Sequence, residues 1–162
     1  MSVSLTVAVI VSCVGSGLIA GVFFAFSSFV MPALWRLPAA AAIAAMQTIN
    51  QTAVRPSFIV VLFGTAMVSI AATVWSLLDF SGASAGWMIG GSVSYLLGVI
   101  GLTAFYQVPL NEELARTLPT SQDAAGIWAR YVVRWSVGNH IRAVAGVAAA
   151  AAFAVAIMVA SR

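Results

Sequence analysis

The chain has 162 residues, of which 62% are hydrophobic and 7% are charged, and its mean hydropathy is +1.07. Ordinary soluble domains carry charge at about 25% of their positions, so this composition excludes a water-soluble globule. The formal net charge is +3, but the arginines are dispersed along the chain, which excludes a basic patch for nucleic acid.

Four apolar segments follow one another along the chain, at about residues 5–30, 58–78, 87–106 and 138–160. Each is long enough to cross a hydrocarbon core of about 30 Å as a helix. The first segment lacks a basic region before it and exceeds the usual apolar core of a signal peptide, so we expect a retained span. Uninterrupted apolar runs lack the alternation of barrel strands. The sequence therefore predicts an all-α, integral membrane four-helix bundle, with residues 1–162 as one four-span domain.

The connections 32–56 and 107–137 are long and lie on one face of the membrane, whereas 79–86 is short. Pro38 suits the first turn of a helix, and after it a stripe on one helix face carries the amides of Gln47 and Asn50.

The second long connection also has helical signals. Asn111, after Pro109, is expected to cap a short helix that ends near Pro119, and Thr120 with Asp123 resembles a capping box. No proline follows, so the fourth helix is expected to be long, with about 40 residues, and to project beyond the bilayer.

Small residues recur every four positions on two spans, which lets helix backbones approach each other closely. We expect these rows to be packing seams. They consist of Cys13, Gly17, Gly21 and Ala25 on the first span and of Gly90, Ser94 and Gly98 on the third.

The metal chemistry open to one subunit is limited by a single cysteine, Cys13, and a single histidine, His140. A two-histidine-one-carboxylate iron site, a bis-histidine haem and a three-histidine zinc site all need more histidines. No protein metal site is therefore expected, although a haem held by one histidine stays open.

The projecting part of the fourth helix places Trp128, Tyr131, Trp135, Asn139 and Arg142 on one face. One interpretation is that the aromatic residues lie at the membrane interface and that Arg142 snorkels toward the headgroups. The other is that the face lines a pocket for a flat aromatic or quinonoid molecule, whose oxygens Asn139 and Arg142 hold.

Two further residues are candidates for proton transfer. His140 points away from that face, so it is either hydrogen-bonded to another helix or a base. Glu112, beside the end of the third span, is either a salt-bridge partner of Arg142 or Arg116 or a general base.

Four segments, residues 24–34, 46–50, 108–114 and 128–142, resemble in their order the anthrone oxygenase-like family of small four-span membrane proteins. That family joins many uncharacterised bacterial members to polyketide-pathway enzymes that oxidise anthrones to anthraquinones with molecular oxygen. The resemblance implies a monooxygenase that acts on a hydrophobic small molecule in the bilayer, here of a bacterial inner membrane. The excess of arginines in the long connections places these in the cytoplasm.

The resemblance also implies a set of pocket residues, to which the aromatic face adds Trp128 and Tyr131. An anthrone anion can react with oxygen without a metal or cofactor, so the protein need only bind, deprotonate and shield it. His140 or Glu112 would take the proton, and Asn139 and Arg142 would stabilise the oxyanion. The residues that the resemblance carries over are Asn50, Asn111, Trp135, Asn139, His140 and Arg142.

A different class of function stays open beside the oxygenase. A non-enzymatic membrane protein that binds a lipid, a quinone or a haem, or that supports a partner complex, would need no paired nucleophile and base, and the sequence shows none. A homo-oligomer also stays open.

Overall fold

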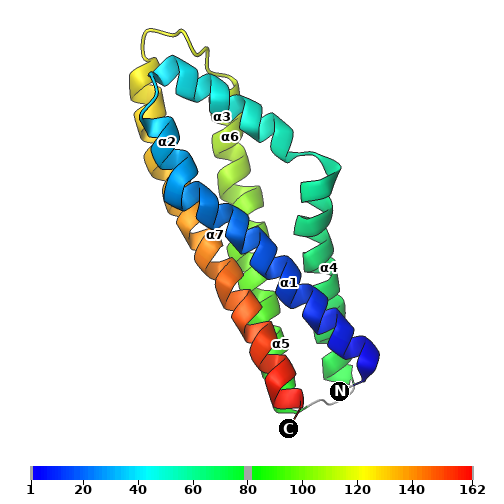
Figure 1. Ribbon diagram of the computed structural model, residues 1–162. Helices are drawn as coiled ribbons and strands as arrows, with labels where there is room; N and C mark the ends of the chain where they lie inside the picture. The colour runs from blue at the N-terminus through cyan, green and yellow to red at the C-terminus, as the bar shows by residue number, and fades with distance from the viewer. Residues whose placement is uncertain (1, 79–81, 162) are drawn as a thin grey trace.

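The computed structural model describes residues 2–78 and 82–161, and every regular element in these ranges is a helix. Four long apolar helices, Val3–Trp35, Pro56–Leu78, Ala83–Ala115 and Ala124–Ala160, are each long enough to cross a membrane. They form a slanted bundle (Figure 1), which confirms the predicted all-α membrane fold. The elements are α1 (Val3–Ala25), η1 (Phe26–Val30), α2 (Met31–Trp35), α3 (Ala39–Ala53), α4 (Pro56–Leu78), α5 (Ala83–Val93), η2 (Ser94–Gly101), η3 (Thr103–Gln107), α6 (Val108–Ala115) and α7 (Ala124–Ala160).

The helix α3 lies across one end of the bundle, where it joins α2 to α4 (Figure 1). It begins directly after Pro38, as predicted. The start of α1 and the end of α7 lie together at the opposite end of the bundle, as expected for an even number of spans. Both long connections are therefore at the α3 end of the bundle, where residues outside the spans can contribute to a site.

Two prolines lie inside long helices, although the first span was expected to end before Pro32 and a separate helix to begin after Pro109. A proline inside a helix lacks one N–H donor and clashes with a carbonyl of the preceding turn. Here a wider, π-helical turn precedes each proline, η1 before Pro32 and η3 before Pro109, and the helix continues. The prediction that Asn111 caps a helix is therefore wrong, because Asn111 lies within α6 and its side chain faces α7.

The last helix, α7, has 37 residues, which corresponds to about 55 Å of length. It is the long fourth helix that the sequence predicts. Its N-cap residue is Asp123, but no capping hydrogen bond from a side chain forms there, so the predicted capping box is absent. The Asp123 carboxylate instead lies 3.1 Å from the Arg130 guanidinium.

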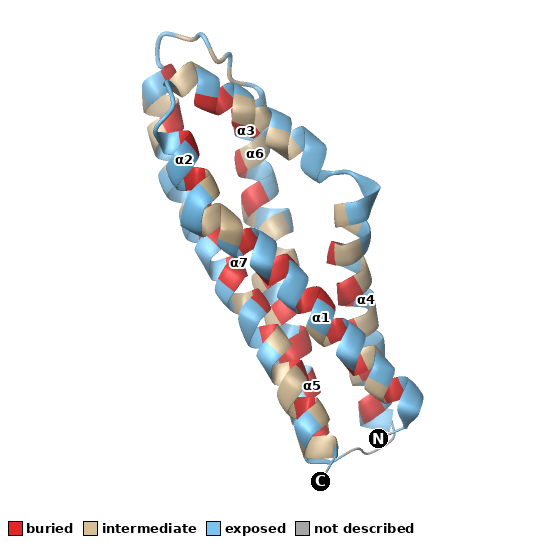
Figure 2. Cartoon of the chain, in the orientation of Figure 1, coloured by how far each residue is buried: buried red, intermediate tan, exposed pale blue. Residues whose placement is uncertain are grey.

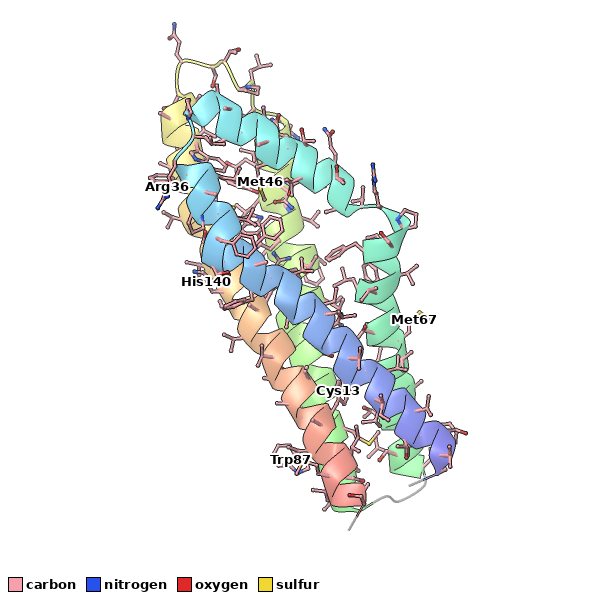
Figure 3. The ribbon with its side chains drawn as sticks, in the orientation of Figure 1. Cys13, Arg36, Met46, Met67, Trp87 and His140 are labelled. Atoms are coloured by element: carbon pink, nitrogen blue, oxygen red, sulfur yellow. The ribbon has the colours of Figure 1, made fainter. Side chains whose placement is uncertain are left out.

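The outer faces of the four long helices are apolar and exposed, while the buried residues form narrow strips between the helices (Figure 2). Met67 and Trp87, for example, project outward from α4 and α5 (Figure 3), and Met67 is 71% exposed. Exposed apolar surface of this extent is what a lipid environment accommodates, so the bilayer is a partner of the chain.

The predicted packing seam on the first helix is confirmed at Cys13, whose thiol lies 3.3 Å from the Ala150 carbonyl of α7, and is wrong at its two glycines. Gly17 and Gly21 are exposed, and nothing lies within 4 Å of the position that a methyl group would take there. The close contacts occur at Gly15, which packs on Thr65 of α4, and at Gly146 of α7, which packs on α1. The four-residue spacing of small residues does not show whether a row faces lipid or another helix, because both surroundings accept small residues.

On the third long helix the seam is partly confirmed. Gly98 packs against Ala145, and the Ser94 hydroxyl donates to the Ala145 carbonyl at 2.9 Å. Gly90 is exposed, and the neighbouring Gly91 makes the close contact instead, against Phe153.

Candidate ligand cavity

A cavity of about 360 Å³ lies inside the α3 end of the bundle, within the size range of small-molecule sites. All four long helices and α3 contribute to its walls. Met46 and Ile49 of α3 are part of the lining. The exposed residues Val22 and Phe63, of two membrane-crossing helices, and Val54, just after α3, also belong to it. The exposed part of the lining is therefore largely apolar.

Arg142 is the central polar residue of the cavity and is only 6% exposed. Its guanidinium donates to Asn139 Oδ1 at 2.8 Å and to Thr103 Oγ1 at 3.2 Å. It lies 4.1 Å from the ring centre of Phe23 and 5.6 Å from that of Trp135, distances at which an aromatic ring attracts a cation. In the described part of the chain it has no carboxylate partner, and its buried Nε makes no hydrogen bond.

Asn139 holds Arg142 in place and is itself fully buried. Its Nδ2 donates to the Phe23 carbonyl at 2.7 Å and to Ser27 Oγ at 2.8 Å, both on the first long helix. With its amide nitrogen anchored in this way, Asn139 directs its oxygen at Arg142. The asparagine thus fixes the orientation of the buried charge.

The third long helix contributes two polar residues that the sequence analysis missed, Thr103 and Gln107. Gln107 is 1% exposed, and its Nε2 donates to the Trp135 carbonyl at 2.9 Å. That bond orients the amide, because a flipped amide would place its oxygen against a carbonyl oxygen. The Gln107 Oε1 is left buried without a partner. A row of polar residues at positions 103, 107 and 111, in an otherwise apolar segment, was the available signal.

Close approach of Gln107 to α7 depends on Gly138. A methyl group at this position would lie 2.7 Å from the Gln107 Nε2 and equally close to the Tyr106 ring. The glycine therefore does not distort α7, which is regular, but makes room for the third helix.

The predicted aromatic face of α7 points into the bundle, and all five of its residues are buried. Trp135 lines the cavity, and its indole N–H donates to Asn111 Oδ1 at 3.0 Å. The Tyr131 hydroxyl donates to the same oxygen at 2.9 Å. Tyr131 and Trp128, which stack on each other at 5.6 Å between ring centres, lie beyond the cavity wall.

Asn50 reaches the same cavity from α3, as the resemblance implied. It lies beside Tyr131, and its amide nitrogen is buried without a hydrogen bond of good geometry. Together with the Nε of Arg142 and the Oε1 of Gln107, the residues of the cavity wall thus hold two buried donors and one buried acceptor that find no partner among the described residues.

The two predicted proton acceptors are not brought to the cavity. His140 is exposed on the outside of the bundle, and its Nδ1 lies 2.7 Å from Ser27 Oγ. Glu112 is exposed at 3.8 Å from the Arg116 guanidinium. Among the described residues that line the cavity there is no Asp, Glu or His.

The sequence of the chain matches the model of a known family, described as anthrone oxygenase, over residues 55–152, which is more than half of its length. The chain belongs to the anthrone oxygenase family. The matched region includes Gln107, Asn111, Trp135, Asn139 and Arg142, and so most of the polar wall of the cavity. Comparisons with curated proteins and with solved structures gave no match.

Proposed function

We propose that this member of the anthrone oxygenase family is a membrane oxygenase, which binds the anion of an anthrone-like or phenolic substrate in the cavity. The observation that carries the proposal is the buried guanidinium of Arg142, which lines the cavity and has no carboxylate partner in the described part of the chain. A buried unpaired charge is costly, and an anionic ligand compensates it.

The chemistry that fits this site needs no metal. An anthrone loses a proton from its CH₂ carbon because the resulting anion is aromatic, and the carbanion transfers electrons to O₂ and forms a C–O bond. The hydroperoxide, once protonated, loses water by cleavage of its O–O bond and leaves a ketone. One anthrone and one O₂ thus give one anthraquinone and one water.

The residues of the cavity have distinct roles in this proposal. Arg142 stabilises the negative oxygen of the substrate anion, and Asn139 keeps Arg142 in place. Phe26 and Trp135, whose ring centres lie 5.5 Å apart with the planes tilted by 48°, offer apolar aromatic surface to the substrate rings. Gln107 Oε1 accepts from a hydroxyl group of the substrate.

The proton that the substrate loses goes to water at the membrane surface as the substrate enters. Arg142 favours this step because it retains the anion. His140 reaches the cavity only through Ser27 and Asn139, so we give it a positioning role.

The orientation in the membrane follows the arginines. Arg36, Arg55, Arg116, Arg130 and Arg134 are exposed and belong to the end of the bundle that α3 crosses. By the positive-inside rule, these arginines support our proposal that this end lies in the cytoplasm of a bacterial cell.

A direct test uses the protein purified in mild detergent, with its absorption spectrum and metal content recorded first. Oxygen consumption is then measured with emodin anthrone, against the spontaneous oxidation of the same solution without protein. Turnover that a chelator does not abolish, that Arg142→Gln loses and that Arg130→Gln keeps, supports the proposal. Consumption that never exceeds the spontaneous rate overturns it.

A second candidate function is binding without turnover, of a quinone or of an anionic lipid. It is favoured by the lack of any Asp, Glu or His on the cavity wall in the described part of the chain. In that case emodin anthrone or a quinone would quench tryptophan fluorescence through Trp135 with no oxygen consumed, and Arg142→Gln would weaken the quenching.

A further inference from the structure

A second concave site lies on the outside of the bundle, on the other side of the contact between the first and last long helices. It is an open groove of about 520 Å³ between α2 and α7. Figure 3 shows Arg36 and His140, which belong to its lining, on the same outer edge of the bundle. Neither residue lines the internal cavity, and the oxygenase proposal uses His140 only as a positioning residue and assigns no ligand to the groove.

The end of the groove nearest to α3 carries a cation. Arg36 is exposed and has no ion pair in the described part of the chain, unlike Arg116, Arg130 and Arg134, which each lie near a carboxylate. Its neighbour Trp35 is 53% exposed, and both follow an apolar span. Tryptophan and arginine at such a position lie at the level of the lipid headgroups.

The wall between the two ends is apolar. Pro32, which is exposed, forms one side above the buried Met31, and Val133, which is 65% exposed, forms the other. Such a surface can contact lipid acyl chains below the headgroup level, and it offers no polar group that would bind a water-soluble ligand.

The inner end of the groove carries a hydrogen-bond donor. Ser27 Oγ accepts from Asn139 Nδ2, so its own proton is free to point at His140 Nδ1, 2.7 Å away. In the form of His140 that accepts at Nδ1, the ring proton lies on Nε2. The groove therefore combines a cation, an apolar wall and, deeper in the membrane, an N–H donor.

We propose that this groove binds one anionic phospholipid. The phosphate pairs with Arg36, an ester carbonyl accepts from the Nε2–H of His140, and an acyl chain lies along Pro32 and Val133. Basic grooves between membrane helices select anionic headgroups in this way, and one arginine near the surface changes the binding constant about fivefold.

The test is native mass spectrometry of the detergent-purified full chain, titrated with phosphatidylglycerol or with phosphatidylcholine of the same acyl chains. We expect one tightly bound phosphatidylglycerol, and about fivefold weaker binding for Arg36→Gln. Arg55→Gln is the matched control, because Arg55 is also exposed and unpaired in the described part of the chain but lies outside the groove. Equal retention of both lipids by the wild type, or equal losses in the two variants, overturns the proposal.

A second variant tests whether the lipid lies in this groove, without a change of charge. Val133→Trp fills the groove from an exposed position, so the bundle keeps its interior packing, which circular dichroism and the Tm verify. We expect it to lose the bound phosphatidylglycerol as Arg36→Gln does. Unchanged lipid binding overturns the proposal, and so does a wild-type dimer that Val133→Trp dissociates, since the groove would then be an interface between two copies.

Discussion

Asn139 and Ser27 are joined across the interface of the last and first long helices by a hydrogen bond of 2.8 Å. The same Ser27 oxygen pairs with His140, and the same Asn139 side chain accepts from Arg142. Asn139 and His140 are neighbours in the sequence and point to different sides of α7, yet one hydroxyl on the first helix contacts both. Ser27 is therefore the contact between the outer groove and the internal cavity.

Replacement of Arg142 should lower the activity without lowering the stability of the fold. Arg142→Met should lower oxygen consumption by roughly 10²–10³-fold, the loss typical of a missing oxyanion partner. Its Tm should stay equal or rise, because the variant no longer buries an unpaired charge. An oxygen electrode and thermal unfolding measure the two effects. Arg130→Met, at an exposed ion pair with Asp123, serves as control and should change neither by much.

The hydroxyl of Ser27 should matter although it does not line the cavity. Ser27→Ala leaves Asn139 with only the Phe23 carbonyl as acceptor, so Arg142 is less firmly oriented. We expect about a tenfold lower kcat and a free energy of unfolding reduced by about 1 kcal/mol. Ser28→Ala is the control, since the Ser28 hydroxyl is exposed and bonds only within its own helix. Equal effects of the two substitutions would contradict the idea that Ser27 orients Arg142 through Asn139.

Two glycine substitutions of the same kind should have opposite effects. Gly138→Ala forces Gln107 and Tyr106 away from α7 and should destabilise the protein by about 1–3 kcal/mol. Gly17→Ala meets open space on the lipid side and should stabilise it by about 0.5–1 kcal/mol, since alanine favours the helix. Denaturation in detergent measures both. A destabilising Gly17→Ala would show that another copy of the chain packs on that face.

The carboxylate of Glu112 should be dispensable. It is exposed, and the ion pair that it forms with Arg116 in the described part of the chain is of a kind that contributes at most about 1 kcal/mol. Glu112→Gln should therefore keep oxygen consumption within about twofold and leave the Tm unchanged. A large loss of turnover with a normal Tm would instead return Glu112 to the role of general base.

The membrane fold could be predicted from the sequence because it depends on the length of apolar runs, a property that neighbours do not alter. The face of α7 that points into the bundle could be predicted for a related reason. That helix is regular from Ala124 to Ala160, so counting residues around a helical wheel places Trp135, Asn139 and Arg142 together correctly.

The contribution of the third long helix could not be found in this way. Its π-helical turns, η2 and η3, change the number of residues per turn, so a wheel drawn for an α-helix loses register before it reaches Gln107. In the sequence, Pro109 also indicates a helix boundary, although in the structure the preceding π-helical turn allows the helix to continue through it. The helical wheel placed His140 on a different face from Asn139 but left open whether His140 turns to the pocket. The sequence could not decide this, because its partner Ser27 comes from a helix more than a hundred residues earlier.

The exposed lining of the cavity has a consequence for kinetics. Val22 and Phe63 line the cavity, are exposed and belong to membrane-crossing helices, so for a substrate that enters between them the concentration that counts would be its mole fraction in the lipid. Adding inert phospholipid at constant substrate should then slow turnover by surface dilution. Substrates would be ranked by their partition into the bilayer as much as by their fit to Arg142.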